Sequence, residues 1–392
     1  MLPFCRMDSL VKRDFWLKVI EQAWAHRSIL WLSGVRRSGK TSLTRTLGKV
    51  EYFDCELPRV RQTMTDPEGF LSSLKGKRII LDEVHRLRAP AELLKIAADH
   101  FPSIKVLATG SSTLGASRKF RDTLTGRKTN IWLTPMIHKD LDAFGKENLR
   151  HRLLFGGLPP FFLNTKLPEK DFQEWIDEYW AKDIQELFRL GRRTSFQQFA
   201  ELIMSRSGGI FEATRFTSEC EASRVTIRND LRVLEETFVA HVIRPFNSHR
   251  PNEIIAAPKV YAFDTGFVSY HRGWNELRSE DLGLLWEHYV LNELHAHLQT
   301  RDIRYWRDKR GHEIDFVMSR RNQPPTAIEC KWTQNSFDVK NLKAFRRMYS
   351  KGQNFVVCSD VDRPYVQNYE SITVQFVSLN HLIEKIEPSQ NP

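Results

Sequence analysis

Two groups of residues in this chain have the types and spacing needed for chemistry, and they require different substrates. Near the N-terminus, residues 34–41 read GVRRSGKT, the pattern of a glycine-rich loop that binds phosphate. Near the C-terminus, Asp315 is followed by Glu329-Cys330-Lys331, which provide two carboxylates and an ammonium group. The first group predicts ATP, and the second predicts a phosphodiester. Together they indicate a protein that uses a nucleotide to control an act on nucleic acid.

The glycine-rich loop lies in the sequence context that its chemistry requires. Residues 28–32 (SILWL) are an apolar run typical of a buried strand, and residues 40–47 have helical character. Glycines let the backbone wrap closely around phosphate, and the amides at a helix start point toward an anion. Lys40 would reach the β- and γ-phosphates, and the Thr41 hydroxyl would bind Mg²⁺. The residues expected to bind the nucleotide are Gly34, Arg36, Arg37, Ser38, Gly39, Lys40, Thr41, Ser42, Asp82 and Ser111.

A second apolar run, residues 78–83, ends in two acids that suit nucleotide hydrolysis. It predicts a buried strand. Asp82 at its end would hold Mg²⁺, directly or through water. Glu83 would act as the general base that polarises the attacking water. An exposed acidic pair after a core strand is the alternative interpretation.

Residues 104–109 predict a third strand, and Ser111 and Ser112 follow it. A polar side chain there would sense the γ-phosphate. We favour Ser111 or Ser112 for this role, although a turn-forming role fits the position as well. Arg127 could stabilise transition-state charge within the chain or across a subunit interface. Its alternative is an ordinary exposed arginine.

At these positions the chain resembles the AAA-type ATPases, the additional-strand class of P-loop proteins. Four motifs carry the resemblance, in order: GVRRSGKT at 34–41, LDE at 81–83, TGSS at 109–112 and GR at 126–127. The likeness covers about residues 10–160. It implies ATP binding and assembly into a homo-oligomer. Many such relatives also carry a C-terminal nuclease-like domain.

The C-terminal acids lie on a predicted order of helix, strand, strand, turn and strand. The helix is expected over residues 281–298, and the strands over 303–307, 311–318 and 327–332. Side chains alternate along a strand, so Glu329 and Lys331 share one face, and a hairpin would bring Asp315 to Glu329. Two carboxylates there would bind Mg²⁺ or Mn²⁺, while Lys331 would orient the water. Glu287, on the helix, could complete the cluster.

This arrangement resembles the restriction-endonuclease-like superfamily, whose signature is PD-(D/E)xK, over about residues 264–375. The resemblance implies nucleic-acid cleavage at Asp315, Glu329 and Lys331. Four cations just before the site could hold a phosphate backbone: Arg304, Arg307, Lys309 and Arg310. The alternatives are a strand pair that lines an ordinary surface and an inactive relic of the fold.

The middle of the chain predicts two modules after the breaker cluster GGLPP at 156–160. Residues 170–190 have apolar and aromatic positions at helical spacing, which predicts a lid or connector. Residues 195–246 read as a winged helix, with helices expected at 196–204 and 217–222, a strand at 238–243 and the wing at 247–251. Its third helix, residues 225–235, could enter a major groove. The candidate DNA contacts are Arg224, Thr226 and Arg228, with Arg244, His249 and Arg250 in or near the wing; a packing or protein-interaction module is the alternative.

Composition sets the outer bounds of the prediction. The net charge of +11 favours a polyanionic partner, with DNA favoured over other nucleic acids. The five cysteines show no CxxC spacing, and no apolar run is long enough to span a bilayer. We therefore expect a cytoplasmic α/β multidomain protein without a membrane partner. Its modules would be an ATPase core with a parallel sheet (1–145), a helical connector (146–194), a winged helix (195–262) and a nuclease-like α/β domain (263–392). The alternative function is a nucleotide-switched DNA-binding or signalling scaffold with an inactive nuclease fold.

Overall fold

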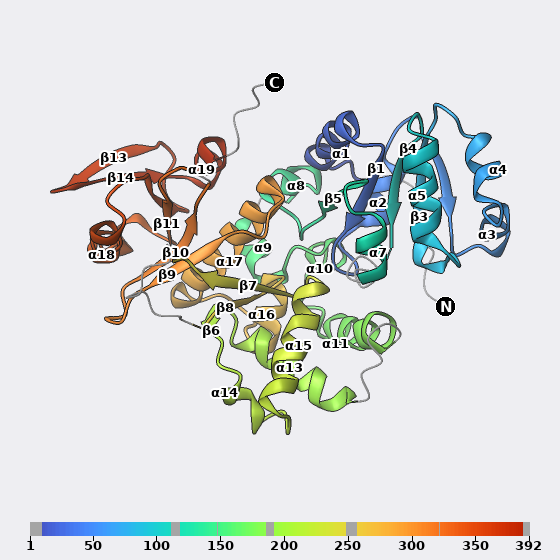
Figure 1. The fold of residues 1–392 in the computed structure, drawn as a ribbon. Helices are drawn as coiled ribbons and strands as arrows, with labels where there is room; N and C mark the ends of the chain where they lie inside the picture. The colour runs from blue at the N-terminus through green and yellow to red at the C-terminus, as the bar shows by residue number, and fades with distance from the viewer. Residues whose placement is uncertain are drawn as a thin grey trace. The chain divides into compact units, whose positions relative to one another are not determined.

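The computed structural model describes residues 10–110, 118–146, 148–185, 192–247, 257–320 and 322–386. The chain forms two compact units. The N-terminal unit comprises residues 1–148, 157–193 and 236–239, and the C-terminal unit comprises residues 149–156, 194–235 and 240–392. Both units combine helices with strands, so the predicted α/β class is confirmed (Figure 1).

The N-terminal unit is built on a five-stranded parallel sheet with the strand order β2-β3-β4-β1-β5. Its strands are β1 (Ile29–Ser33), β2 (Glu51–Asp54), β3 (Arg78–Asp82), β4 (Lys105–Thr109) and β5 (Lys128–Trp132). The three strands that the apolar runs predict are all present. Strand β4 lies between β1 and β3, so one extra strand separates the strand before the glycine-rich loop from the strand that ends in Asp82.

Helices cover this sheet because their apolar residues recur at helical spacing. Helix α1 (Asp14–His26) buries Trp16, Ile20 and Trp24, which are four residues apart, and packs on β1 and β5. The other helical segments of this unit are α2 (Lys40–Arg45), α3 (Pro58–Thr63), α4 (Pro67–Ser72), η1 (Val84–Arg86), α5 (Pro90–His100), α7 (Arg118–Thr123), α8 (His138–Ala143), α10 (Pro159–Phe162), α11 (Glu169–Glu178) and η2 (Tyr179–Gln185). The described part of the predicted 170–190 connector is therefore helical, and η2 is a π-helical turn.

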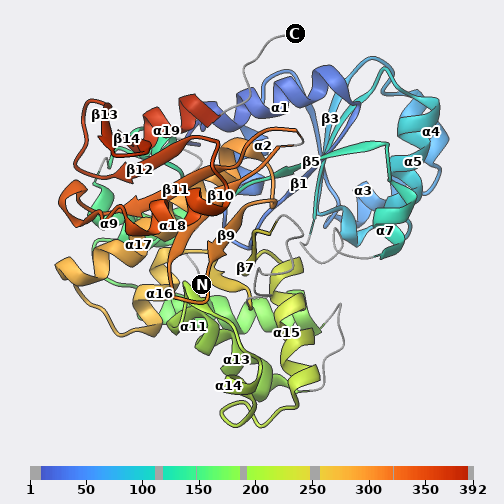
Figure 2. The same cartoon turned by 60° about the vertical axis from the view of Figure 1, so that its left-hand side comes forward.

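The C-terminal unit contains a nine-stranded sheet with the order β13-β14-β12-β11-β10-β9-β7-β8-β6. The strands are β6 (Gly209–Ile210), β7 (Ala240–Pro245), β8 (Lys259–Ala262), β9 (Arg304–Arg307), β10 (Glu313–Met318), β11 (Thr326–Lys331), β12 (Asn354–Cys358), β13 (Tyr365–Tyr369) and β14 (Ile372–Val377). Figure 2 shows β9 to β12 side by side. The predicted order of helix and three strands around Asp315 is present.

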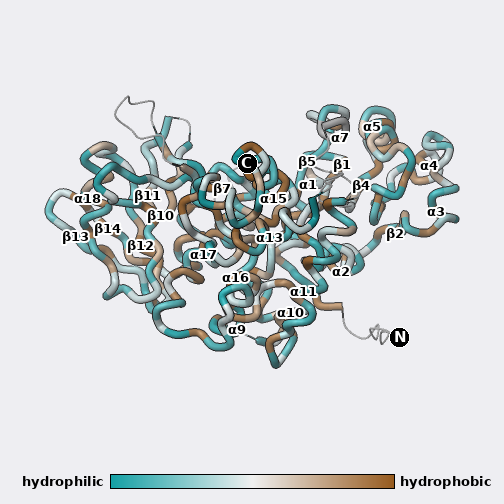
Figure 3. The backbone as a smooth tube through the Cα atoms, turned by 90° about the horizontal axis from the view of Figure 1, so that it is seen from below, coloured by the Kyte–Doolittle hydropathy of each residue, from teal (hydrophilic) through white to brown (hydrophobic). Residues whose placement is uncertain are grey.

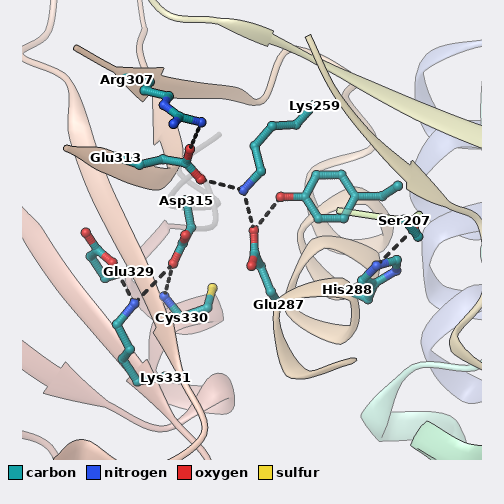
Figure 4. A network of polar contacts seen from close by, with 11 residues as sticks. Ser207, Lys259, Glu287, His288, Arg307, Glu313, Asp315, Glu329, Cys330 and Lys331 are labelled. Carbon is teal, nitrogen blue, oxygen red and sulfur yellow. Dashed lines mark hydrogen bonds and ion pairs between the residues drawn. The ribbon is translucent and has the colours of Figure 1, made fainter. Parts of the chain in front are cut away.

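The C-terminal unit also contains helices. They are α9 (Leu149–Phe155), α13 (Arg193–Ser205), α14 (Thr214–Thr217), α15 (Arg224–Glu236), α16 (Thr265–His271), α17 (Ser279–Leu298), η3 (Gln334–Ser336), α18 (Lys340–Met348) and α19 (Leu379–Ile386). The long helix α17 contacts β11, and its Trp286 indole donates to the Val357 carbonyl on β12 at 3.0 Å. Figure 4 shows Glu287 of this helix pointing toward Lys259 of β8.

Three details differ from the sequence-based expectation in the 195–262 region. The second helix spans Thr214–Thr217 rather than 217–222, and Glu221 has a left-handed φ of 47°, which no helix continues through. The strand expected from 238 begins at Ala240, because Phe238 has a φ of 66°. Strand β7 also pairs in parallel with β9, with Arg244 opposite Arg304, so one sheet joins the regions that we predicted as separate modules.

The predicted wing lies largely outside the described residues, since only Asn247 of 247–251 is described. His249 and Arg250 are therefore not placed. The winged-helix and nuclease-fold names, and the four module boundaries, stay predictions.

Hydrophobic residues occur along the chain as short segments between polar ones (Figure 3). Within the described ranges, no helix is both long and apolar enough to cross a membrane. Even the 20-residue α17 carries several charged and histidine side chains.

Candidate functional site

The glycine-rich loop joins β1 to α2 and has the backbone conformation that its glycines permit. Gly34 has a φ of 149°, and a β-carbon there would lie 2.4 Å from the Leu133 carbonyl oxygen. Gly39 has a φ of 92° and precedes α2, which begins at Lys40. Thr41 and Ser42 therefore lie in the first turn of this helix. Both glycines are required by geometry, as the motif predicts.

Lys40 is oriented back over the loop. Its Nζ donates to the carbonyl oxygens of Gly34 and Val35 at 2.9 and 3.0 Å. Burial lowers the pKa of Lys40, and the nearby carboxylates of Glu83 and Asp183 oppose this effect. Among the described residues, this ammonium group hydrogen-bonds to these two carbonyl oxygens alone, so it is suited to bind the oxygens of a phosphate.

A buried ion pair also holds the loop, and no sequence motif predicts it. Arg13 binds Asp140 through two hydrogen bonds of 3.0 and 2.6 Å. The third Arg13 nitrogen, Nη1, donates to the Ser38 carbonyl at 3.0 Å. Both side chains are almost fully buried. Arg13 thus fixes the middle of the loop, while the Ser38 hydroxyl is buried without a hydrogen-bond partner within the described part of the chain.

The two loop arginines, which we predicted to bind nucleotide, contact acids of α11 and η2. Arg36 Nε lies 3.1 Å from Asp183 Oδ2, and Arg37 Nη2 lies 3.3 Å from Glu178 Oε1. The Trp175 indole also donates to the Arg36 carbonyl at 3.1 Å. Burial raises the pKa of Asp183, and Arg36 opposes that shift. The helical connector is therefore attached directly to the loop.

Asp82 is held at the end of β3 by two hydroxyl groups. Thr109, the last residue of β4, donates to one carboxylate oxygen, and Tyr52 donates to the other. The Glu83 amide donates to the Thr109 hydroxyl at 3.1 Å. We predicted a polar role for the serines after β4, and Thr109 was not among the predicted residues. Thr109 ends the strand that neighbours β3, and this position could have indicated a contact with Asp82.

Glu83 has a left-handed φ of 55° and contacts His85, whose Nδ1 lies 3.0 Å from the carboxylate. Burial acts to raise the pKa of Glu83, but the His85 hydrogen bond and the charge of Lys40 hold it below its ordinary value. Glu83 is thus a carboxylate at neutral pH, as a general base must be.

Two other predicted residues do not join this group. Ser111, together with Ser112, lies outside the described residues. Arg127 Nε donates to Asp99 on α5 at 2.7 Å, and its Nη1 lies 3.5 Å from the Thr123 carbonyl. These contacts lie on α5 and α7 rather than on the loop. A role for Arg127 toward another subunit stays a prediction.

In the C-terminal unit, strands β10 and β11 form the hairpin that the sequence predicts, with Phe316 opposite Ile328. Figure 4 shows the resulting cluster. Lys331 Nζ lies 2.9 Å from Glu329 Oε2 and 3.7 Å from Asp315 Oδ2. The Cys330 amide donates to Asp315 Oδ2 at 2.8 Å. The two acids and the lysine are therefore brought together, and their catalytic role stays a prediction.

Glu329 is the most enclosed member of this cluster. Its side chain is 1% exposed, and within the described residues its Oε1 has no hydrogen-bond partner. Burial, followed by the neighbouring Asp315 carboxylate, raises the pKa of Glu329 to about 8. Burial and Glu287 also raise the pKa of Asp315, while Lys331 opposes the shift. Two crowded carboxylates with an unpaired buried oxygen fit a divalent cation that prefers oxygen ligands.

Within the described residues, no group of three or more histidine, cysteine or acidic side chains is arranged to hold a metal ion. Asp315 and Glu329 would each contribute a carboxylate, with other oxygen ligands completing the shell. Glu287 accepts instead from Lys259 Nζ at 2.9 Å and from the Tyr261 hydroxyl. Lys259 also donates to Glu313 at 2.8 Å. Lys259, which sequence reasoning missed, thus binds Glu287 beside the cluster.

Comparisons with known proteins agree with the N-terminal geometry. Residues 26–141 match the AAA domain family. The matched range contains the glycine-rich loop, Asp82 and the five strands of the parallel sheet. Residues 146–278 and 282–381 match two domains of unknown function, DUF8612 and DUF4143.

Two mycobacterial relatives match most of the chain. The chain is 27% identical over 313 residues to Uncharacterized protein Rv2008c of Mycobacterium tuberculosis and equally to Mb2031c of Mycobacterium bovis, which covers 76% of this chain and 69% of each relative. Among solved structures, the Walker-type ATPase paby2304 of Pyrococcus abyssi is 15% identical, with a TM-score of 0.43, over 68% of this chain and 97% of that one.

Proposed function

We propose that the chain binds and hydrolyses ATP in its N-terminal unit and cleaves a phosphodiester bond of nucleic acid in its C-terminal unit. The observation that carries the second half is the enclosed pair of Asp315 and Glu329, with the unpaired buried Oε1 of Glu329 and the ammonium group of Lys331 beside it. The AAA domain match supports the first half.

In the nucleotide site, each described residue has a role that its position supports. Lys40 would exchange its two loop carbonyl partners for oxygens of the β- and γ-phosphates. Thr41 and Asp82 would hold Mg²⁺, with Asp82 oriented by Thr109 and Tyr52. Glu83, kept ionised by His85, would accept a proton from the attacking water. Amides of residues 34–42 would bind the phosphates.

In the carboxylate site, Asp315 and Glu329 would hold Mg²⁺ or Mn²⁺. When bound, such an ion supplies Lewis-acid chemistry, since it neutralises phosphate charge and acidifies water. Lys331 would contribute a positive charge next to the reacting phosphate, at a position fixed by Glu329. Glu287, bound by Lys259 and Tyr261, would position Lys259 rather than a metal.

A cleavage assay tests the proposal. The purified protein is incubated with plasmid, single-stranded DNA and RNA in Mg²⁺, in Mn²⁺ and in a chelator. Metal-dependent cleavage that Glu329→Ala and Lys331→Ala both abolish, in variants that keep the wild-type circular dichroism, supports the nuclease. For the ATPase, Lys40→Ala should abolish phosphate release; undiminished hydrolysis by this variant would refute the assignment of the loop.

One observation favours a second function, a nucleotide-switched DNA-binding scaffold. Lys331 Nζ lies within ion-pair distance of both acids, at 2.9 and 3.7 Å, and offsets one of their two negative charges. Wild-type protein that binds DNA and leaves it intact in both Mg²⁺ and Mn²⁺ would establish this function instead. We also propose that the ATPase domain assembles into a homo-oligomer, which light scattering with and without ATP would measure.

A further inference from the structure

Two hollows in the C-terminal unit share part of their lining. One, of about 820 Å³, lies between α13, α14 and the turn from β9 to β10. The other, of about 600 Å³, lies between α14, α15 and β7. Phe211 and Glu212 line both of them. This pair of residues therefore lies between the two hollows, which are neighbours in the C-terminal unit.

The lining of the combined hollows is strongly cationic. It contains eight basic side chains and only three acidic ones, Glu212, Glu235 and Asp308. All eight basic side chains are exposed to solvent: Arg206, Arg215, Arg224, Arg228, Arg232, Arg244, Arg307 and Lys309. Such a concentration of one sign of charge in a concave surface attracts polyanions.

Helix α15 supplies the least neutralised part of this lining. Arg224, Arg228 and Arg232 are four residues apart, so they form a stripe on one face of the helix. Within the described residues, none of the three takes part in a side-chain hydrogen bond or ion pair, whereas Arg244 across the hollow is fixed by two bonds of 2.8 and 3.0 Å to Glu235. At a rise of about 1.5 Å per residue, the stripe spans roughly 12 Å.

The other end of the lining leads to the carboxylate cluster. Arg307 lies 3.5 Å from Glu313, and Glu313 is two residues before Asp315 on the same strand, so their side chains share a face. Figure 4 shows Arg307, Glu313 and Asp315 in this succession. A polyanion that lies in the hollows would thus approach the cluster through Arg307.

We infer that these two hollows form one groove that binds the sugar–phosphate backbone of nucleic acid and leads it from α15 to Asp315. The inference rests on the proposed phosphodiester cleavage and adds Arg206, Arg215 and Arg232 as backbone contacts. The α15 stripe offers three cations, one for each of three phosphates of one strand. The arginines of α15 then hold phosphates rather than reading bases.

The test is fluorescence anisotropy with the full chain in a chelator, using labelled duplex DNA, single-stranded DNA and RNA of one sequence. The variant Arg224→Gln, Arg228→Gln, Arg232→Gln removes the stripe. The matched control is Lys340→Gln, Lys343→Gln, Arg347→Gln, which removes three cations from α18, outside both hollows. Each phosphate contact contributes about −0.9 to the slope of log K against log salt for a duplex.

We expect the stripe variant to lower the magnitude of this slope by about 2 to 3 for duplex DNA and to weaken binding roughly a hundredfold at about 0.1 M salt. The α18 control should change the slope by less than about one unit and should weaken binding much less than the stripe variant does. Equal effects of the two variants would overturn the proposed groove. A wild-type protein that binds none of the three nucleic acids would also overturn it, and an acidic protein would then be the partner that fits the hollows.

The failure of the groove and the failure of the nuclease have different signatures. The p-nitrophenyl ester of thymidine 5′-monophosphate is a diester too short to reach α15. If the carboxylate site cleaves it, the stripe variant should cleave it at the wild-type rate, whereas Glu329→Ala should not cleave it. Glu329→Ala should in turn bind the duplex with the wild-type slope.

Discussion

Replacement of Glu329 by glutamine should make the protein more stable while it abolishes cleavage. The carboxylate is 1% exposed, its Oε1 has no hydrogen-bond partner within the described residues, and Asp315 adds a like charge nearby. Glutamine removes the buried charge and its repulsion with Asp315, and leaving a charged group desolvated costs more than the about 1–3 kcal/mol of a neutral polar group. Lys331 keeps Asp315 as a partner at 3.7 Å and is a quarter exposed to water. We therefore expect Glu329→Gln to raise the free energy of unfolding by about 1–3 kcal/mol in a chelator at pH 8.

Metal ions should reverse the order of stability of the wild-type protein and the Glu329→Gln variant. A ligand that binds only the folded state stabilises it by about 2.7 kcal/mol at a hundred times its dissociation constant. Wild-type protein should gain this stability in Mg²⁺ or Mn²⁺, and Glu329→Gln should not. Urea unfolding followed by tryptophan fluorescence measures both effects, because C-terminal tryptophans such as Trp286 and Trp306 are buried.

Glu313→Gln is the matched control. Glu313 is an acid of the neighbouring strand β10, and it is paired with Lys259 at 2.8 Å. Its replacement should therefore lower stability instead. A Glu329→Gln variant that is less stable than the wild type, with no stabilisation of the wild type by metal, would refute the reasoning. Glu329 would then be a structural partner of Lys331 rather than a residue that gives up stability for function.

Three further outcomes are expected. Arg13→Met should lower the free energy of unfolding by about 3–5 kcal/mol in urea titrations, because it leaves the Asp140 carboxylate buried and unpaired, and it should weaken ATP binding; normal stability would contradict the importance of this pair. Arg127→Ala removes an exposed ion pair and should change stability by less than about 1 kcal/mol, and a large loss of ATPase activity that mixing with Lys40→Ala restores would reveal action across subunits. Burial lowers the pKa of His288 and of His295 to about 3, so both are protonated only on unfolding, and stability should fall by about 1.4 kcal/mol per histidine for each pH unit below 6.5; melting temperatures that stay constant from pH 7 to pH 5 would contradict this.

The sequence predicted those features that depend on neighbours along the chain. The glycine-rich loop, the strands around Asp82 and Thr109, and the shared face of Glu329 and Lys331 follow from motif and from a period of two. The hairpin that brings Asp315 to Glu329 follows from two strands separated by a proline turn.

Features that depend on distant segments could not be predicted in this way. Arg13 and Asp140 are 127 residues apart, and neither lies in a motif. Lys259 meets Glu287 only because β8 joins the same sheet that α17 packs against. Hydrophobic periodicity indicates which face of a strand is buried, but it does not indicate the neighbouring strand, so the pairing of β7 with β9 was also missed.

The segments of the two units alternate along the chain, and this limits how the units can recombine during evolution. Each unit is assembled from three separate stretches, and the chain passes between the units five times. A single genetic exchange within residues 149–239 would therefore leave both units with missing parts. Asp183, for example, follows a stretch of the C-terminal unit but contacts the loop arginine Arg36. We expect the N-terminal and C-terminal units of this protein to be inherited together, rather than exchanged as separate domains.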